Sequence, residues 1–122
     1  MADERRVLIL DDDPLVGLLV ETVARLAGAA TQLTTTHAEF HTACQAWSPT
    51  HIVLDLTLPG FTGEQVLAEL AALGCRARIV VSSGADTVRM GEAVALGREL
   101  QLDIAGALPK PFAPAALRVL LA

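Results

Sequence analysis

Three consecutive carboxylates, Asp11, Asp12 and Asp13, follow the apolar run at residues 7–10. Asp13 precedes Pro14 and is predicted to cap a helix, because an aspartate side chain accepts hydrogen bonds from the free amides of a first helical turn. Asp11 and Asp12 come directly off a buried strand, where neighbouring carboxylates repel each other unless a cation neutralises them. A few ligands, all of them oxygen, suit Mg2+, which keeps water in its shell and accepts phosphate oxygens. Asp11 and Asp12 are therefore predicted to bind Mg2+.

A fourth carboxylate, Asp55, ends the apolar run at residues 52–54. If this run and residues 7–10 are neighbouring parallel strands, Asp55 faces Asp11 and Asp12. A carboxylate can attack phosphorus and form an aspartyl phosphate when a metal screens its charge and bridges the incoming oxygens. The plainer alternative is an aspartate that only begins a turn.

Two serines, Ser82 and Ser83, end the apolar run at residues 79–81 and precede Gly84. A hydroxyl at this position can donate a hydrogen bond to a phosphoryl oxygen, and a small neighbour leaves room for the group to approach. The alternative is a pair of serines that only stabilises a turn.

The only lysine, Lys110, stands between two prolines after the apolar run at residues 105–108. It therefore cannot lie inside a helix. Its ammonium group is a natural counter-charge for a phosphate and for Asp55. The bond to Pro111 is a candidate cis peptide.

Elements that would bring these residues together alternate along the chain. Short apolar runs, typical of parallel strands covered on both faces, occur at residues 7–10, 30–33, 52–54, 79–81 and 105–108. Segments with helical spacing follow them at residues 14–27, 37–47, 63–73, 87–100 and 114–122. Gly28 and Gly74 are placed to end the first and third helices. Gly91 and Gly97 should make the fourth helix the least rigid.

Strict alternation of strands and helices predicts a doubly wound α/β sandwich with right-handed crossovers. With the common strand order 2-1-3-4-5, the first and third strands flank the switch point, and ligands bind at the carboxyl ends of the strands. The predicted site residues all follow strands, at this edge of the sheet.

Composition excludes several classes of function. The length of 122 residues suits one domain, over residues 1–122. A net charge of −5 argues against a nucleic-acid surface, because phosphate contact needs clustered basic residues. Apolar runs are too short for a membrane span or a signal peptide. Cys44 and Cys75 lack metal-ligand or disulfide-framework spacing and are predicted to be small buried or half-buried hydrophobes. We expect a cytoplasmic domain that contacts neither membranes nor nucleic acid.

The chain is similar, over essentially its whole length, to response-regulator receiver domains of two-component systems, the CheY-like superfamily. The matching segments are residues 10–14, 55–63, 83–84 and 110–112. The resemblance implies a flavodoxin-like (βα)5 sandwich with a five-stranded parallel sheet. It also implies a signalling phosphoacceptor and not an ordinary enzyme, since such domains catalyse only their own phosphoryl transfer and dephosphorylation.

The resemblance implies a role for each metal ligand. Asp55 would accept the phosphoryl group from a histidine kinase or a histidine phosphotransfer protein. Asp12 and Asp55 would bind Mg2+ directly, together with the backbone carbonyl of Thr57. Asp11 would act through a water molecule.

Ser83 and Lys110 would contact the phosphoryl group, Ser83 by a hydrogen bond and Lys110 by neutralising its charge. Ser83 is preferred to Ser82 because glycine follows it and because its separation from Asp55 is usual for the family. The resemblance further implies an output domain or partner at the face of the fourth helix, fifth strand and fifth helix. It also implies a homodimer that forms on phosphorylation.

Two features depart from the family pattern. Receivers commonly carry Tyr or Phe three residues before the lysine, where this chain has Ala107, so signalling by ring rotation is not expected. The segment 97–106 is longer than usual, and with residues 106–112 it is similar to receivers joined to EAL-type cyclic-di-GMP phosphodiesterases.

Two alternative functions use the same residues differently. A haloacid-dehalogenase-type phosphatase also forms an aspartyl phosphate, but it needs a second acid two residues after the nucleophile, where Thr57 stands. A pseudo-receiver would bind partners without phosphorylation. Beryllofluoride or acetyl phosphate would distinguish the pseudo-receiver from a phosphoacceptor, because only the phosphoacceptor responds to them with Mg2+.

Overall fold

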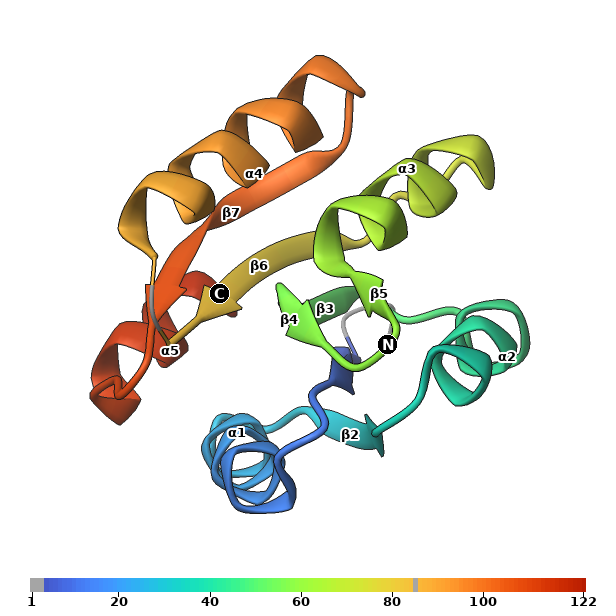
Figure 1. Cartoon of the computed structure of the whole chain (residues 1–122). Helices are drawn as coiled ribbons and strands as arrows, with labels where there is room; N and C mark the ends of the chain where they lie inside the picture. The colour runs from blue at the N-terminus through green and yellow to red at the C-terminus, as the bar shows by residue number, and fades with distance from the viewer. Residues whose placement is uncertain (1–3, 85) are drawn as a thin grey trace.

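A computed structural model describes residues 4–84 and 86–122. The main sheet consists of β1 (Arg6–Leu10), β2 (Ala30–Thr34), β3 (His51–Asp55), β6 (Arg78–Ser83) and β7 (Asp103–Pro109). The helices are α1 (Pro14–Leu26), α2 (His37–Trp47), α3 (Gly63–Ala72), α4 (Thr87–Glu99) and α5 (Pro114–Leu120). A short antiparallel hairpin, β4 (Thr57–Leu58) and β5 (Phe61–Thr62), lies between β3 and α3 (Figure 1).

The sheet is parallel throughout, in the order β2-β1-β3-β6-β7. Counted along the chain without the hairpin, this is the predicted order 2-1-3-4-5. β1 and β3 are central neighbours, and the chain runs from β1 outward to β2 before it returns to β3. The switch point therefore lies between the ends of β1 and β3, as the sequence predicted.

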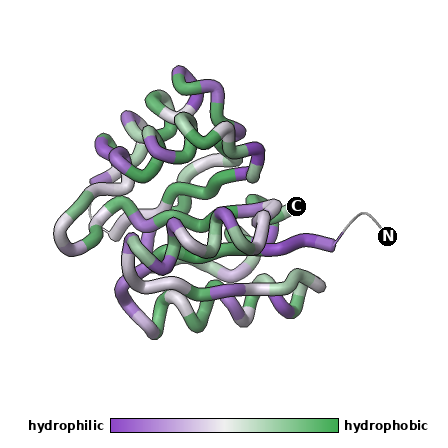
Figure 2. The backbone as a smooth tube through the Cα atoms, turned by 90° about the vertical axis from the view of Figure 1, so that its right-hand side faces the viewer, coloured by the Kyte–Doolittle hydropathy of each residue, from purple (hydrophilic) through white to green (hydrophobic). Residues whose placement is uncertain are grey.

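Helices cover both faces of the sheet, which explains why its strands are apolar on both faces. Alternate residues of β1, such as Val7 and Ile9, pack in one core with residues of α1 and α5. Leu8 and Leu10 point the other way, into a second core with residues of α2, α3 and α4. In Figure 2 hydrophobic and hydrophilic positions alternate along the helical coils, as expected for helices that pack one face on the sheet. No helix in residues 4–84 and 86–122 is both long and apolar enough to cross a membrane.

Local signals placed the start of α1 and, to within one residue, the ends of α1 and α3, whereas α5 ends at Leu120 and not at residue 122 as expected. Asp13 caps α1, where its side chain accepts from the amides of Leu15 and Val16. After α1 and α3, Gly28 and Gly74 adopt φ values of 93° and 69°, in the left-handed region where glycine has no Cβ penalty. The hairpin β4–β5 was not predicted, because two-residue strands carry no readable alternation.

Gly97 has a packing role that the sequence did not reveal. A Cβ there would lie 2.6 Å from Cδ1 of Ile104, so glycine lets α4 approach β7 closely. At Gly91 a Cβ would meet nothing within 4 Å. The interpretation that both glycines serve to loosen α4 is therefore incomplete, because Gly97 allows the helix to pack.

Cys44 and Cys75 are free thiols, partly buried against the core of α2, α3 and α4. Burial raises the pKa of Cys44 to about 12, with a further contribution from the nearby Cys75. Burial also raises the pKa of Cys75. Both groups are therefore thiols at neutral pH and contribute apolar contacts.

Candidate functional site

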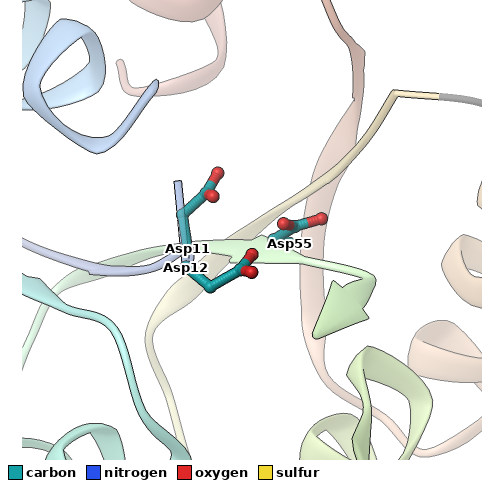
Figure 3. A group of neighbouring side chains, drawn as sticks. All are labelled: Asp11, Asp12 and Asp55. Atoms are coloured by element: carbon teal, nitrogen blue, oxygen red, sulfur yellow. The ribbon is translucent and has the colours of Figure 1, made fainter. Parts of the chain in front are cut away.

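The ends of β1 and β3 bring Asp11, Asp12 and Asp55 together. Each offers a carboxylate oxygen, and these oxygens all lie within 4.8 Å of one another (Figure 3). Asp11 and Asp55 are buried, at 4% and 5% relative exposure, whereas Asp12 is exposed. Asp12 makes no side-chain hydrogen bond or ion pair with any described residue, so its carboxylate is available to an external ligand.

The backbone fixes one oxygen of each buried carboxylate. The amide of Asp13 donates to Oδ1 of Asp11 at 2.9 Å, and the amide of Thr57 donates to Oδ1 of Asp55 at 3.1 Å. Both bonds come from the residue two positions on, as in an Asx turn. The turns that follow β1 and β3 therefore orient these side chains.

Lys110, at the end of β7, bridges the other two oxygens. Its Nζ lies 2.7 Å from Oδ2 of Asp11 and 3.2 Å from Oδ2 of Asp55, and the lysine side chain is only 17% exposed. The amide of Lys110 donates to the carbonyl of Ser83, which joins β7 to the end of β6. The Lys110–Pro111 peptide bond is cis, as predicted.

The charges of this cluster are unbalanced. Burial raises the pKa of Asp55, and the nearby Asp11 adds to this, although the Thr57 amide and Lys110 partly oppose it. Burial alone would lower the pKa of Lys110, but hydrogen bonds and charge from Asp11 and Asp55 together hold it above its ordinary value. The cluster thus holds three carboxyl groups and a single ammonium group, an excess of acidic groups that a divalent cation would balance.

The two serines differ in their contacts. The Ser82 hydroxyl donates to the carbonyl of Leu108 at 3.0 Å, inside the sheet. The Ser83 hydroxyl, on the opposite face of β6, has no hydrogen-bond partner among the described residues, although Ser83 is only 2% exposed. A Cβ on Gly84 would lie 3.9 Å from Cβ of Lys110 in ordinary contact, so the protein alone does not require glycine there.

Sequence reasoning missed Arg89, in the first turn of α4. Its guanidinium donates to the carbonyl of Leu56 and the hydroxyl of Thr57, directly after Asp55, and it forms an ion pair with Glu64. The sequence did contain one indication that Arg89 has a specific contact. A cation in the first turn of a helix is unfavourable next to the helix dipole, so it needs a compensating partner. The sequence did not indicate which partner that would be.

Comparisons with known proteins point to one family. The family model of the response regulator receiver domain matches residues 7–122. The DNA-binding response regulator MtrA of Mycolicibacterium smegmatis is 32% identical over 110 residues, which are 90% of this chain and 46% of that protein. The chain thus spans about half the length of this relative.

Solved structures show the same fold. A response regulator from Colwellia psychrerythraea is 26% identical with a TM-score of 0.83, covering 96% of this chain and 93% of that one. A response regulator protein from Burkholderia pseudomallei, solved with a phosphorylated aspartic acid, calcium ion and citrate, is 21% identical with a TM-score of 0.81. That match covers 98% of this chain and 67% of the other.

The chain belongs to the response regulator receiver domain family. It is a signalling domain of the two-component type.

Proposed function

We propose that the chain is a single receiver domain that accepts a phosphoryl group on Asp55 with Mg2+ and changes conformation in response. The observation that carries the proposal is the cluster of Asp11, Asp12 and Asp55, in which Asp11 and Asp55 share the partly buried ammonium group of Lys110. An excess of negative charge favours a divalent cation, and the cation in turn allows a buried carboxylate to approach a phosphoryl donor.

Mg2+ would be held by the carboxylates of Asp12 and Asp55 and the backbone carbonyl of Thr57, with Asp11 acting through water. The donor set fits a hard cation, because it consists of oxygen atoms only. When bound, the ion would neutralise charge on the phosphoryl oxygens during transfer.

The remaining residues would prepare Asp55 and receive the group. The Thr57 amide already orders one oxygen of Asp55, which leaves Oδ2 beside Lys110 as the nucleophile. This oxygen would attack phosphorus of a phosphohistidine on the donor, so that a P–O bond forms while the P–N bond to histidine breaks. Lys110 would neutralise the added negative charge, and the Ser83 hydroxyl, which bonds no side chain or carbonyl within residues 4–84 and 86–122, would donate to a phosphoryl oxygen.

A receiver role implies two kinds of partner, a phosphoryl donor and an output domain or protein. The phosphoryl donor would be a histidine kinase or a histidine phosphotransfer protein, in the cytoplasm. The output domain or partner would contact the face formed by α4, β7 and α5. The relative from Mycolicibacterium smegmatis is a DNA-binding regulator, whereas the EAL-type output remains a prediction from the sequence.

Acetyl phosphate with Mg2+ provides the direct test. The protein is expected to gain the mass of one phosphoryl group, measured by intact-mass spectrometry, and to gain none when a chelator removes the metal. The Burkholderia pseudomallei protein, which carries a phosphorylated aspartic acid, is a suitable positive control. A wild-type chain that stays unmodified while this control reacts would instead favour a module that acts without phosphorylation.

Asp12→Ala is expected to weaken Mg2+ binding at least tenfold, because one direct carboxylate ligand is lost. The unliganded variant should also unfold at a slightly higher temperature, since removing a carboxylate reduces repulsion in the cluster. Titration calorimetry and thermal unfolding measure the two effects. Asp13→Asn is the matched control, because asparagine still caps α1. Equal Mg2+ affinity in Asp12→Ala and wild type would contradict the proposed metal site.

A further inference from the structure

Arg89 connects α4 to the acceptor loop, defined here as residues 56 and 57 directly after Asp55. Its Nη2 donates to the Leu56 carbonyl at 2.7 Å, and its Nη1 donates to the Thr57 hydroxyl at 3.2 Å. Nε and Nη2 also donate to the two carboxylate oxygens of Glu64, each at 2.9 Å. One side chain thus joins α4, the acceptor loop and the first turn of α3.

This arrangement is more specific than an ordinary surface ion pair. The pairing with Glu64 is bidentate, and the guanidinium and carboxylate are 29% and 31% exposed. The hydrogen bonds that Arg89 donates to Glu64 raise the pKa of Arg89, so its charge is permanent. An exposed pair of two flexible side chains contributes little, but a planar guanidinium that binds four acceptors in fixed positions also sets geometry.

Backbone hydrogen bonds also fix the acceptor loop in place beside Asp55. The amide of Leu56 donates to the Ser82 carbonyl, and the Leu56 carbonyl accepts from the amide of Gly63 as well as from Arg89. A Cβ on Gly63 would lie 2.8 Å from Cα of Leu56, so only glycine allows this approach. The acceptor loop is therefore held by β6 and α3 as well as by Arg89, so its position is closely fixed.

The start of α4 is connected to the site twice. Along the chain it follows Ser83, whose hydroxyl would engage the phosphoryl group. Through Arg89 it is bonded to the acceptor loop, and Asp86 fixes the backbone of Arg89 by accepting from its amide at 3.0 Å. Ala107, where related receivers carry a ring, is exposed and has only a methyl group to offer. A large side chain is therefore not available there to move α4.

We propose that Arg89 is a positioning residue that couples the acceptor loop to α4, so that ligand binding at Asp55 is transmitted to α4 through the contacts of Arg89 with Leu56, Thr57 and Glu64. This inference rests on the proposed function. Coupling of this kind is reciprocal: contacts that let the ligand reposition α4 also let α4 influence the affinity for the ligand. Removing them should change the transmitted response and also the binding.

The test compares Arg89→Gln with Arg98→Gln, its matched control. Both variants lose one positive charge from α4, but the Arg98 side chain donates to the carbonyl of Ile104 and, among the described residues, bonds no part of the acceptor loop. Amide hydrogen exchange with and without Mg2+ and beryllofluoride should show a ligand-induced change in residues 87–99 of wild type and of Arg98→Gln. In Arg89→Gln this change should be lost while residues 55–57 still respond. Affinity for Mg2+ and beryllofluoride should fall about two- to thirtyfold.

Glu64→Gln refines the assignment. The amide retains an acceptor for Arg89 and leaves the contacts with Leu56 and Thr57, so its effect on affinity should be smaller than that of Arg89→Gln. A role limited to stability would lower the unfolding temperature in both variants but leave the ligand-induced change in α4 intact.

The outcomes distinguish this inference from the proposed function. A wild-type chain that does not respond to Mg2+ and beryllofluoride overturns both. Two other outcomes overturn the role of Arg89 but leave the proposed function standing. In the first, wild type responds in residues 55–57 but not in α4. In the second, α4 responds equally in Arg89→Gln and in Arg98→Gln. If Arg89→Gln does not fold, Arg89→Lys takes its place against Arg98→Lys, because lysine keeps the charge but cannot bind all four acceptors. Equal α4 responses in the two lysine variants would then overturn the coupling.

Discussion

Asp55→Asn is expected to abolish phosphorylation by acetyl phosphate while the fold is preserved. An amide has nearly the same shape as the carboxylate and can still accept the hydrogen bond from the Thr57 amide. It lacks the negative charge that makes the Oδ2 atom beside Lys110 a nucleophile. Intact-mass spectrometry after treatment with acetyl phosphate and Mg2+ measures the result.

The same variant should be more stable than wild type without metal at neutral pH. Because burial raises the pKa of Asp55, the unfolded chain releases this proton at a lower pH than the folded protein does. Ionisation of Asp55 therefore disfavours folding, and stability falls as pH rises from the ordinary aspartate pKa through the raised one. The advantage of asparagine should appear across this window and disappear in more acid solution, as thermal unfolding at several pH values would show.

Asp13→Asn provides the control for both measurements, since it neutralises a neighbouring carboxylate that only caps α1. It should be phosphorylated like wild type. An undiminished phosphoryl adduct in Asp55→Asn would mean that another residue is the acceptor. A stability difference that persisted unchanged in acid would mean that the charge of Asp55 is not its cause.

The sequence was sufficient to place the acidic site because one geometric rule governs it. In a parallel sheet of this order the carboxyl ends of β1 and β3 are adjacent, so the residues that follow them must meet. The proximity of Asp11, Asp12 and Asp55 could therefore be predicted without any knowledge of side-chain packing. Lys110 follows the edge strand, β7, and its long side chain spans the remaining distance.

Element boundaries depended on how clearly each end was marked. The second helix, His37–Trp47, was predicted to the residue, because it begins after the cap Thr36 and ends before Ser48 and Pro49. The strand β7 was predicted too short, at residues 105–108 against Asp103–Pro109. Its pairing with β6 is irregular, with Ile79 opposite Ile104 and Val80 opposite Gly106, and such a bulge interrupts the apolar pattern.

Contacts between side chains of distant elements could not be predicted. Arg89 meets Leu56 across 33 positions of sequence, and the contact depends on the rotation of α4 about its axis. That rotation depends on packing, including the approach of Gly97 to Ile104. Periodicity identifies which face of a helix is buried, but α4 is weakly amphipathic, and its sequence left the partners of its first turn open.

Lys110→Met is expected to destabilise the folded protein by about 3 kcal/mol at neutral pH, because it leaves two buried carboxylates without their shared counter-charge. Methionine retains much of the volume and the apolar stem, so most of the loss reflects charge. It should also slow phosphorylation strongly, since the ammonium group beside Asp55 that would neutralise the added charge is then missing.

The dependence on pH identifies the cause of this loss. Because Asp11 and Asp55 hold the pKa of Lys110 above its ordinary value, the stabilisation is fully present below the ordinary lysine pKa and is lost as pH rises through the raised one. In wild type it also diminishes in acid, where Asp55, whose pKa is raised by burial, takes up a proton. The difference between wild type and Lys110→Met should therefore be largest at neutral pH and shrink on both sides, as chemical denaturation at several pH values would measure. Arg118→Met, which removes an exposed cation from α5, should change stability little at any pH. A deficit in Lys110→Met that stayed constant from acid to alkaline pH would point to lost packing and not to the ion pairs with Asp11 and Asp55.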